Sequence, residues 1–540
     1  MATERTPVLI VGAGPVGLAL AIELGMRDIP CRIIERNDRV GYAPRAKTTH
    51  VRTRELLRRW GMAAELANAS PFGIDYPSDV VFVTRMAGHA LARIENAFNC
   101  DPEPDPRYSE HAQWIPQYRL EEVLRRRVAT LPHVDIRFNC EFLTSRQGEA
   151  GLDSLARDLI TGETLAIESE YLVGADGARS AVREAIGAKM EGRYGLSRNY
   201  NVVFRAPGLA EAHSHGRAIM YWQVNADAPS LLGPMDTDDR WFFMPTGVPE
   251  GFHLSAQDAA AMIRKATGLE LPYEILSTDE WVASEFIADT YRDRRIFLAG
   301  DACHLHPPFG GYGMNMGIAD AVDLGWKLAA VIKAWGGEAL LESYEAERRP
   351  IHQRVIEEAV ANHAVLGNQL WQRDLEDDGE TGERARAQAG AAIQAAKQRE
   401  FKNLGVVLGY CYVNSPVIDG EPGTPIMSDV GDYRPSAAPG CIAPHLWLPN
   451  GASLYDKFGA GFTLLAMRGG MEDCLMAAGE DAARLGVPLT LVALDDPRLF
   501  PLYEAALALV RPDQHVAWRG DTWPGASVLV RATGLSAADA

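Results

Sequence analysis

The stretch VLIVGAGPVG, at residues 8–17, decides the fold of this chain. Its four apolar residues predict a buried strand, and Gly12, Gly14 and Gly17 form the pattern G-x-G-x-x-G at the start of a helix. Gly12 permits the tight turn, Gly14 lets the backbone approach a pyrophosphate, and Gly17 lets helix and strand pack closely. Since a helix N-terminus offers unpaired N–H groups to phosphate, the stretch predicts a dinucleotide site.

A second apolar strand at residues 31–34 ends on Glu35 and completes a β–α–β unit. A carboxylate at this position accepts hydrogen bonds from ribose hydroxyls. Val16 lies within the turn and Arg36 follows the acid, so both are candidate contacts of the dinucleotide. The alternative is an ordinary structural turn with a surface carboxylate behind it.

Two further apolar strands end on glycine and aspartate. Residues 171–174 lead into Asp176, and residues 296–299 lead into Asp301. An aspartate at such a strand end can bind a ribityl hydroxyl, and the glycines within 310–315 let the backbone approach a flat ring. Each segment alone is compatible with a plain strand-to-helix turn, but three such turns in one chain form a specific pattern.

With these motifs, the chain resembles the group A flavoprotein monooxygenases, the para-hydroxybenzoate hydroxylase-like family, over about residues 6–360. It is most similar to the longer phenol and polyketide hydroxylases, which carry a thioredoxin-like C-terminal domain. Residues 511–519, RPDQHVAWR, carry the resemblance to that domain. The resemblance implies non-covalently bound FAD, NADPH or NADH as transient electron donor, and O2 as co-substrate.

In this family reduced flavin meets O2 to form a C4a-hydroperoxide, which donates an OH group to an electron-rich ring. The resemblance therefore implies a small aromatic substrate, phenolic or polycyclic. It also implies that the helix beginning near Gly313 stabilises negative charge on the reduced flavin. The implied cofactor-binding residues are Gly12, Gly14, Val16, Gly17, Glu35, Arg36, Arg45, Gln117, Phe142, Asp176, Asp301, Gly311, Gly313, Met314 and Asn315.

The sequence departs from the family at the group that activates the ring. Residues 45–50, RAKTTH, contain no carboxylate where long phenol hydroxylases place an aspartate. His50 and Lys47 are the candidate bases, and a surface position is the alternative for each. A substrate phenol that is acidic enough would need no base. Pro308 is expected to line the reaction zone.

Aromatic residues of the central strands are the candidate substrate contacts, namely Tyr221, Trp222 and Phe243. Filling of the sheet interior is the alternative for each of them. Because side chains alternate along a strand, Tyr221 and Trp222 cannot both face one cavity. His304 and His306 lie in the loop after Asp301, where a structural role is expected for His304.

The predicted fold class is α/β, with a Rossmann-like (GR2-type) FAD-binding domain, an inserted antiparallel β-sheet substrate domain and a C-terminal thioredoxin-like α/β domain. Residues 80–115 are expected to be irregular, and residues 373–400 to be a solvated helix or connection without chemistry. The predicted ranges are 1–190 and 286–370 for FAD binding, 191–285 for the substrate domain, 371–415 for a helical connection and 416–540 for the C-terminal domain.

Composition excludes several classes of protein. The 540 residues carry a formal charge of −19 without a long basic block, which argues against nucleic-acid and anionic-membrane binding. No apolar run is long enough to predict a transmembrane helix, and the first strand leaves no room for a signal peptide. The seven cysteines are scattered and form no CxxC, so we expect no disulfide, no metal site and a cytoplasmic location.

Several functions remain compatible with the motifs. Aromatic hydroxylation is the main prediction. Baeyer–Villiger oxidation of a ketone or quinone uses the same cofactor and oxygen, and a flavin dehydrogenase or reductase would make no peroxide. The segment 307–315, PPFGGYGMN, favours a monooxygenase. The C-terminal domain lacks redox cysteines, so we expect it to serve structure or contacts in a homodimer.

Overall fold

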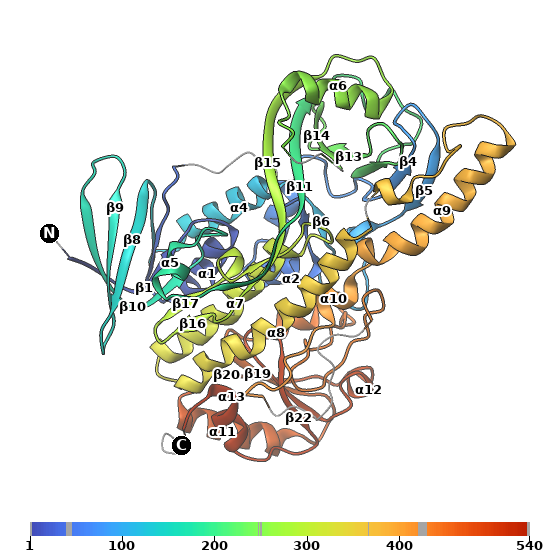
Figure 1. The fold of residues 1–540 in the computed structure, drawn as a ribbon. Helices are drawn as coiled ribbons and strands as arrows, with labels where there is room; N and C mark the ends of the chain where they lie inside the picture. Colours follow the sequence, from blue (N-terminus) through green and yellow to red (C-terminus); the bar gives the residue numbers. More distant parts are fainter. Residues whose placement is uncertain are drawn as a thin grey trace.

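The computed structural model describes residues 3–38, 46–246, 248, 251–365, 367–418 and 429–536. These residues form two eight-stranded sheets, a four-stranded sheet and a two-stranded sheet. In Figure 1 the first sheet lies on the left, the second rises toward the top, and the third lies at the bottom beside the C-terminus. The mixed α/β architecture predicted from the sequence is therefore present.

The first sheet is built on β1 (Thr3–Val11), which pairs in parallel with β10 (Thr164–Gly174) and β2 (Cys31–Ile34). Residues 8–11 are all buried, as expected for a parallel strand with both faces covered. Helix α1 (Pro15–Gly25) follows directly and is also almost wholly buried. The other strands are β7 (Val134–Arg137), β8 (Cys140–Gln147), β9 (Leu152–Asp158), β16 (Arg292–Asp293) and β17 (Ile296–Leu298).

The second sheet is mainly antiparallel, and two long strands form its spine. Strands β11 (Met190–Arg205) and β15 (Glu274–Ala288) run together from the first sheet up to α6 (Ala256–Thr267), as Figure 1 shows. The remaining strands are β4 (Val80–Val83), β5 (Ala90–Ile94), β12 (Met220–Gln223), β13 (Ser230–Pro234), β14 (Arg240–Pro245) and β18 (His304–Leu305). The sheet thus reaches beyond the predicted range 191–285 at both ends.

Two regions differ from the sequence prediction. Residues 80–115 were expected to be irregular, but they contain β4, β5 and β6 (Gln113–Trp114), and β4 pairs in parallel with β12. Their pairing partners lie far away in sequence, so the local pattern gave no sign of them. Residues 373–400 were expected to be solvated, yet α9 (Glu380–Phe401) packs along β5, where a Cβ on Gly390 would lie 2.4 Å from the Leu91 carbonyl oxygen.

Helices connect the sheets and cover their faces. Two long helices lie together, α7 (Tyr312–Ile332), which packs on α1, and α8 (Glu338–His363), which packs on α7. Among the described helices, none is long and apolar enough to cross a membrane. The shorter helices are α2 (Val51–Arg59), α3 (Ala63–Asn68), α4 (Gln117–Ala129), α5 (Ala181–Ala185) and α10 (Leu404–Leu408), and β3 (Thr48–Thr49) pairs with β6.

The C-terminal part is a small α/β unit. Its four strands have the order β20 (Leu489–Ala493), β19 (Phe462–Ala466), β21 (Leu507–Val510) and β22 (Val516–Gly520). Only the pair β19–β20 is parallel. Its helices are α11 (Glu472–Leu485), α12 (Leu499–Tyr503) and α13 (Ser527–Thr533).

A buried ionic cluster joins this unit to the helices above it. The guanidinium of Arg511 donates to Glu347 on α8 at 2.7 and 2.9 Å and to Asp323 on α7 at 3.0 Å. Lys327 Nζ bridges the same two carboxylates at 2.6 and 2.8 Å. All four side chains are almost completely excluded from solvent. Arg511 opens the RPDQH segment, so this turn holds the C-terminal unit against α7 and α8.

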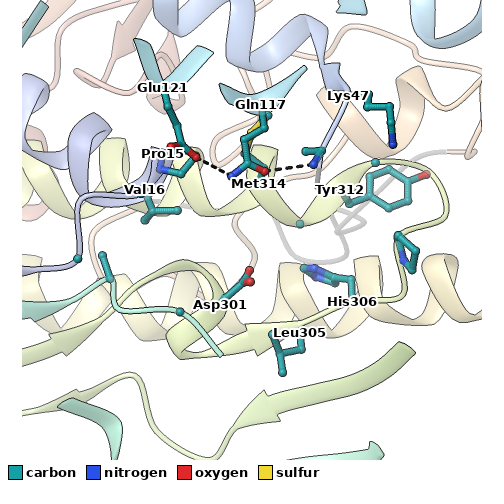
Figure 2. Close-up of a pocket in the computed structure, with 18 of the residues that line it drawn as sticks. Pro15, Val16, Lys47, Gln117, Glu121, Asp301, Leu305, His306, Tyr312 and Met314 are labelled. Carbon is teal, nitrogen blue, oxygen red and sulfur yellow. Dashed lines mark hydrogen bonds between the residues drawn. The ribbon is translucent and has the colours of Figure 1, made fainter. Parts of the chain in front are cut away.

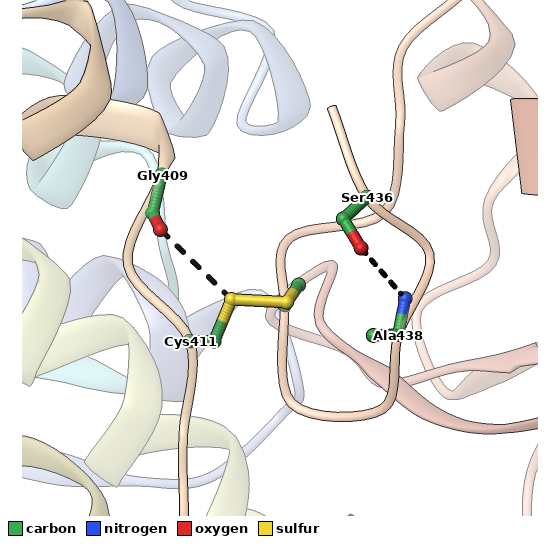
Figure 3. The surroundings of a disulfide bond; sticks show 5 residues. Gly409, Cys411, Ser436 and Ala438 are labelled. Atoms are coloured by element: carbon green, nitrogen blue, oxygen red, sulfur yellow. Dashed lines mark hydrogen bonds between the residues drawn. A yellow bond between two sulfur atoms is a disulfide. The ribbon is translucent and has the colours of Figure 1, made fainter. Parts of the chain in front are cut away.

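A disulfide contradicts the expectation drawn from the cysteine pattern. Cys411, just after α10, is bonded to Cys441 in the segment that enters the C-terminal unit (Figure 3). The same two residues form an isolated antiparallel bridge of the backbone. Spacing along the chain cannot reveal this pair, because the bridge depends on the approach of two segments separated by 30 residues.

Removal of the Arg511 charge should destabilise the protein strongly. In Arg511→Met three buried carboxylates, Glu347, Asp323 and Asp513, would lose this cation, and breaking a buried ionic network typically costs about 3–5 kcal/mol. Chemical denaturation should show this loss in the free energy of unfolding. The control Arg434→Met breaks an exposed pair with Asp432 and should change little. Equal stability of the two variants would contradict the stabilising role of the cluster.

The disulfide predicts a definite thiol count. Without reductant, the unfolded protein should show the five free cysteines of the structure, and after reduction all seven. Closing a loop of this length contributes roughly 3 kcal/mol, so Cys441→Ser should lower the unfolding midpoint. Seven reactive thiols in unreduced protein would show that the bond does not form in solution.

Candidate functional site

One cavity of about 810 Å³ connects the three sequence motifs with the second sheet. Its wall includes the turn after β1, the end of β2, the start of α4, the turn after β10 and residues 305–314. Side chains of β12, β13 and β14 close its other end. The cavity thus lies where the two large sheets meet, and its size suits a bulky ligand.

Two glycines of the first turn lie against backbone, and the third leaves open space that suits a phosphate. A Cβ on Gly12, whose φ is +108°, would lie 2.3 Å from the Ala175 carbonyl oxygen, and a Cβ on Gly17 would lie 1.9 Å from the Gly12 oxygen. Around Gly14 the space is open, with no atom within 4 Å of such a Cβ. Gly14 caps α1 without any side-chain hydrogen bond, so the helix N-terminus opens into the cavity. Gly17 itself lies behind the wall and serves packing.

Glu35 closes the same end of the cavity and is held rigidly. Its Oε2 accepts a hydrogen bond from the Ala13 N–H at 2.8 Å, and its Oε1 accepts one from the Asn37 N–H at 2.9 Å. Arg36 is exposed at the rim, while Phe142 is buried in the wall. Together they form a pocket that suits an adenosine.

Gln117 fixes the segment that leads into β3. Its Oε1 accepts a hydrogen bond from the Ala46 N–H at 3.1 Å, and its Nε2 donates one to Glu121 Oε1 at 2.8 Å (Figure 2). The amide therefore has its orientation set before any ligand binds. The predicted contact Arg45 lies outside the described residues.

Both aspartates of the later motifs line the cavity. Asp176 accepts a hydrogen bond from the Val182 N–H at 3.2 Å, and burial raises the pKa of its carboxyl group. Asp301 is exposed on the short helix η2 (Gly300–Ala302) and points into the cavity in Figure 2. Val16 lines the wall beside it, since a Cβ on Gly300 would lie 2.8 Å from a Val16 methyl group.

The N-terminus of α7 also opens into the cavity. Its cap is Gly311, with φ +69°, and Gly313 and Met314 lie in the wall. Asn315, predicted beside them, does not line the cavity and acts as a brace behind it. Its Nδ2 donates to the Gly311 carbonyl at 2.7 Å and to the Thr48 carbonyl at 2.9 Å.

His50 does not reach the cavity, which contradicts its prediction as the base. Its backbone N–H donates to Asn315 Oδ1 at 2.9 Å, and its ring packs between Phe98 and Tyr312. Burial lowers the pKa of His50 to about 4, although a hydrogen bond to the Gly310 backbone opposes this. His50 therefore supports the 307–311 segment from behind. Pro308 of that segment does line the cavity.

Lys47 does line the cavity. Its ammonium lies 4.1 Å from the centre of the Phe242 ring, and burial lowers the pKa of Lys47 to about 8. Figure 2 shows it well separated from Pro15 and Val16 at the glycine-rich turn. Of the two candidate bases, the structure thus leaves Lys47 in reach of a ligand.

The predicted substrate contacts need correction. Tyr221 and Phe243 point to the opposite face of the second sheet, where they join the apolar cluster beside α6. Trp222 points toward the cavity side but is covered by Phe309 and Lys397. Because side chains alternate along a strand, the neighbouring residues Met220 and Phe242 line the cavity instead. The apolar wall consists of Phe98, Trp114, Met220, Leu231, Phe242, Met244, Phe309 and Phe401.

Two further parts of the cavity wall had no predicted role in the site. Glu400 and Phe401 enter the wall from the end of α9, and no local pattern marked this helix as part of a site. His306 also lines the cavity, whereas His304 is fully buried and binds Asp320 at 2.8 Å. The structural role expected for His304 fits this contact.

Comparison with known proteins agrees with this geometry. Residues 5–359 match the family model described as FAD binding domain, and residues 436–538 match the model described as aromatic-ring hydroxylase, C-terminal. The chain is 33% identical to tetracenomycin B2 monooxygenase-dioxygenase of Streptomyces olivaceus, over 96% of this chain and 95% of that protein. It is 29% identical to 2,4-dichlorophenol 6-monooxygenase of Delftia acidovorans, over 96% and 95%.

Solved structures show the same likeness. The rebeccamycin biosynthetic enzyme RebC with reduced flavin has 35% identity and a TM-score of 0.90, covering 99% of this chain and 100% of that one. The flavin-dependent monooxygenase PieE, in complex with FAD and substrate, has 30% identity and a TM-score of 0.90, covering 98% and 99%. The predicted fold class and FAD as cofactor are confirmed by these matches.

The glycine turn yields a paired prediction. Gly14→Ala adds a methyl group that meets only open cavity, so the apoprotein should keep its stability while FAD binding weakens by roughly 1–3 kcal/mol, as overpacking typically costs. Gly12→Ala should instead impair folding, because its φ is +108° and its Cβ meets the backbone. FAD titration and thermal unfolding of the apoproteins measure both effects. Unchanged FAD affinity in Gly14→Ala would remove this turn from the cofactor site.

Proposed function

This chain belongs to the FAD-dependent aromatic-ring hydroxylases, and on that premise we propose that it uses NADPH or NADH and O2 to hydroxylate a phenolic or polycyclic substrate. It is an FAD-dependent monooxygenase. Its relatives' names describe oxidation of tetracenomycin and of a chlorinated phenol, which supports a ring substrate. The homodimer and the cytoplasmic location stay part of this proposal, as do the domain ranges other than 191–285, beyond which the second sheet extends.

One observation carries the proposal. A single cavity joins an open, phosphate-sized glycine turn to a chamber walled by aromatic side chains. The first end suits the adenosine and pyrophosphate of FAD, and the second suits a flat apolar ring. The isoalloxazine would bind between them, beside Pro308 and the start of α7.

Bound FAD would carry electrons from NAD(P)H to O2 and pass one oxygen atom to the substrate. The chain's own residues prepare the site for this. The aromatic side chains of Phe98, Trp114 and Phe242 would limit the access of water to the chamber when cofactor and substrate are bound. The backbone N–H of Gly313, in the first turn of α7, would stabilise negative charge near the ring.

The test measures oxygen transfer directly. FAD-loaded protein should oxidise NADPH or NADH faster when a suitable phenolic compound is added, and labelled O2 should place one labelled oxygen on the ring carbon. Recovery of that oxygen within an ester would indicate Baeyer–Villiger chemistry instead. Release of H2O2 alone, with every member of a phenol and polycycle panel, would favour an oxidase or reductase and contradict the proposal.

A matched variant ties the reaction to the chamber. Phe242→Ala enlarges the chamber and admits water, so we expect more H2O2 per NAD(P)H consumed and less hydroxylated product. The control Phe243→Ala changes the opposite face of the same strand. It should leave this ratio unchanged in protein that keeps its FAD. Equal ratios in the two variants would mean that the chamber does not hold the substrate.

A further inference from the structure

The substrate chamber contains a cation without an ionic partner. Lys47 lines the cavity just before β3, and its ammonium faces the Phe242 ring at 4.1 Å. Across the described ranges, no carboxylate lies within ion-pair distance of Lys47. The surrounding wall is aromatic, since Phe98 stacks on Trp114 and Trp114 lies 6.5 Å from the Phe242 ring. A buried charge in such surroundings is unfavourable unless a ligand compensates it.

The nearest candidate for compensation is already engaged. Glu400 also lines the cavity, but its Oε2 accepts a hydrogen bond from Lys397 Nζ at 2.9 Å. The carboxylate of Glu400 also accepts a hydrogen bond from the Gly310 backbone. Lys397 in turn lies over the Trp222 ring at 4.3 Å. The pair Glu400–Lys397 is therefore neutral as a unit and leaves the charge of Lys47 unbalanced.

Lys47 lies away from the part of the cavity that suits the FAD phosphates. The open glycine turn and Arg36 lie at the other end of the cavity, and Figure 2 separates Lys47 clearly from Pro15 and Val16. Lys47 instead borders the side chains of β14 and β6 that close the chamber. Its position therefore suits an anion on the substrate rather than one on the cofactor.

We propose that Lys47 binds an anionic oxygen of the aromatic substrate, either an ionised phenol or a ring carboxylate. This inference rests on the proposed function, because it assigns the substrate class of the same chamber. Although burial lowers the pKa of Lys47 to about 8, the group is mainly protonated at pH 7. An ammonium beside a phenol favours loss of the phenol proton, which enriches the ring in electrons without a carboxylate base.

The test compares probes of similar shape that differ in whether they carry an anionic or ionisable oxygen. Naphthoate and naphthamide form one pair, and naphthol and methoxynaphthalene form the other. Each is titrated into FAD-loaded protein at pH 7.5 while the flavin absorbance is followed. The wild type should bind the anionic or ionisable member of at least one pair about tenfold more tightly, as a buried charge pair requires. The two pairs show whether carboxylate or phenol is the group that Lys47 recognises.

Three variants show whether Lys47 causes the preference for anionic or ionisable probes. Lys47→Met should abolish it, and Lys47→Arg should retain most of it. Lys333→Met makes the same change in charge on the exposed end of α7 and should behave as the wild type. FAD affinity of the apoprotein should be unchanged in all three. These comparisons use protein whose FAD content and circular dichroism match those of the wild type.

Several results would overturn the inference. Equal binding of charged and neutral probes by the wild type would do so, as would a preference that survives in Lys47→Met. Loss of FAD affinity in Lys47→Met would assign the lysine to the cofactor. Oxygen transfer to neutral aromatic compounds, at equal rates in wild type and Lys47→Met, would refute the inference and leave the proposed function intact. Absence of oxygen transfer to any compound would instead reject the function.

Discussion

The charges buried along α7 are the constraint on which the rest of the structure depends. Asp320 accepts hydrogen bonds from Arg348 Nε at 2.8 Å and from the Gly300 N–H at 3.1 Å. Although burial raises it, His352 and Arg348 hold the pKa of Asp320 well below its ordinary value. One helical turn later Asp323 joins the Arg511 cluster. Because an unpaired buried charge is so unfavourable, these contacts fix α7 against α8, the Asp301 turn and the C-terminal unit at once.

This placement determines the reaction site. Held by its buried charges, α7 directs its glycine-rich N-terminus into the cavity, and Asn315 ties it to the segment that carries Thr48 and Lys47. The loop at residues 307–311 is held through hydrogen bonds to the Gly310 backbone. One involves the His50 ring, and the other involves the Glu400 carboxylate. The reacting ring and its substrate would therefore meet between walls whose spacing is set before either binds.

The C-terminal unit contributes to the site indirectly. Among the described residues, none beyond Phe401 lines the cavity. The turn at 511–515 instead reaches α2 as well as α7 and α8, because Arg52 Nη1 donates to Gln514 Oε1 at 2.5 Å. The Cys411–Cys441 bond holds the segment that enters the unit. The unit thus acts as a support for the helices that carry the cavity wall.

Much of the cofactor site could be predicted from the sequence, since its determinants are local. Gly12, Gly14 and Glu35 act within one β–α–β unit, and Asp176 and Asp301 each end a recognisable strand. Backbone turns and strand ends depend on neighbouring residues, so the motif fixes their geometry. The short strands at 80–114 were not expected, because their pairing partners lie far away in sequence.

Which side chains line the aromatic end of the cavity depends on the tertiary structure alone. Period-two alternation indicates that Tyr221 and Trp222 face opposite ways, but only the packing of α6 on one face showed that Tyr221 lies away from the cavity. Glu400 and the pair Cys411–Cys441 belong to the site and its support through contacts between distant segments. His50 and Lys47 are equivalent candidates in the sequence, but in the structure Lys47 lines the cavity and His50 does not. A sequence records which side chains are available, whereas long-range packing selects those that share a cavity.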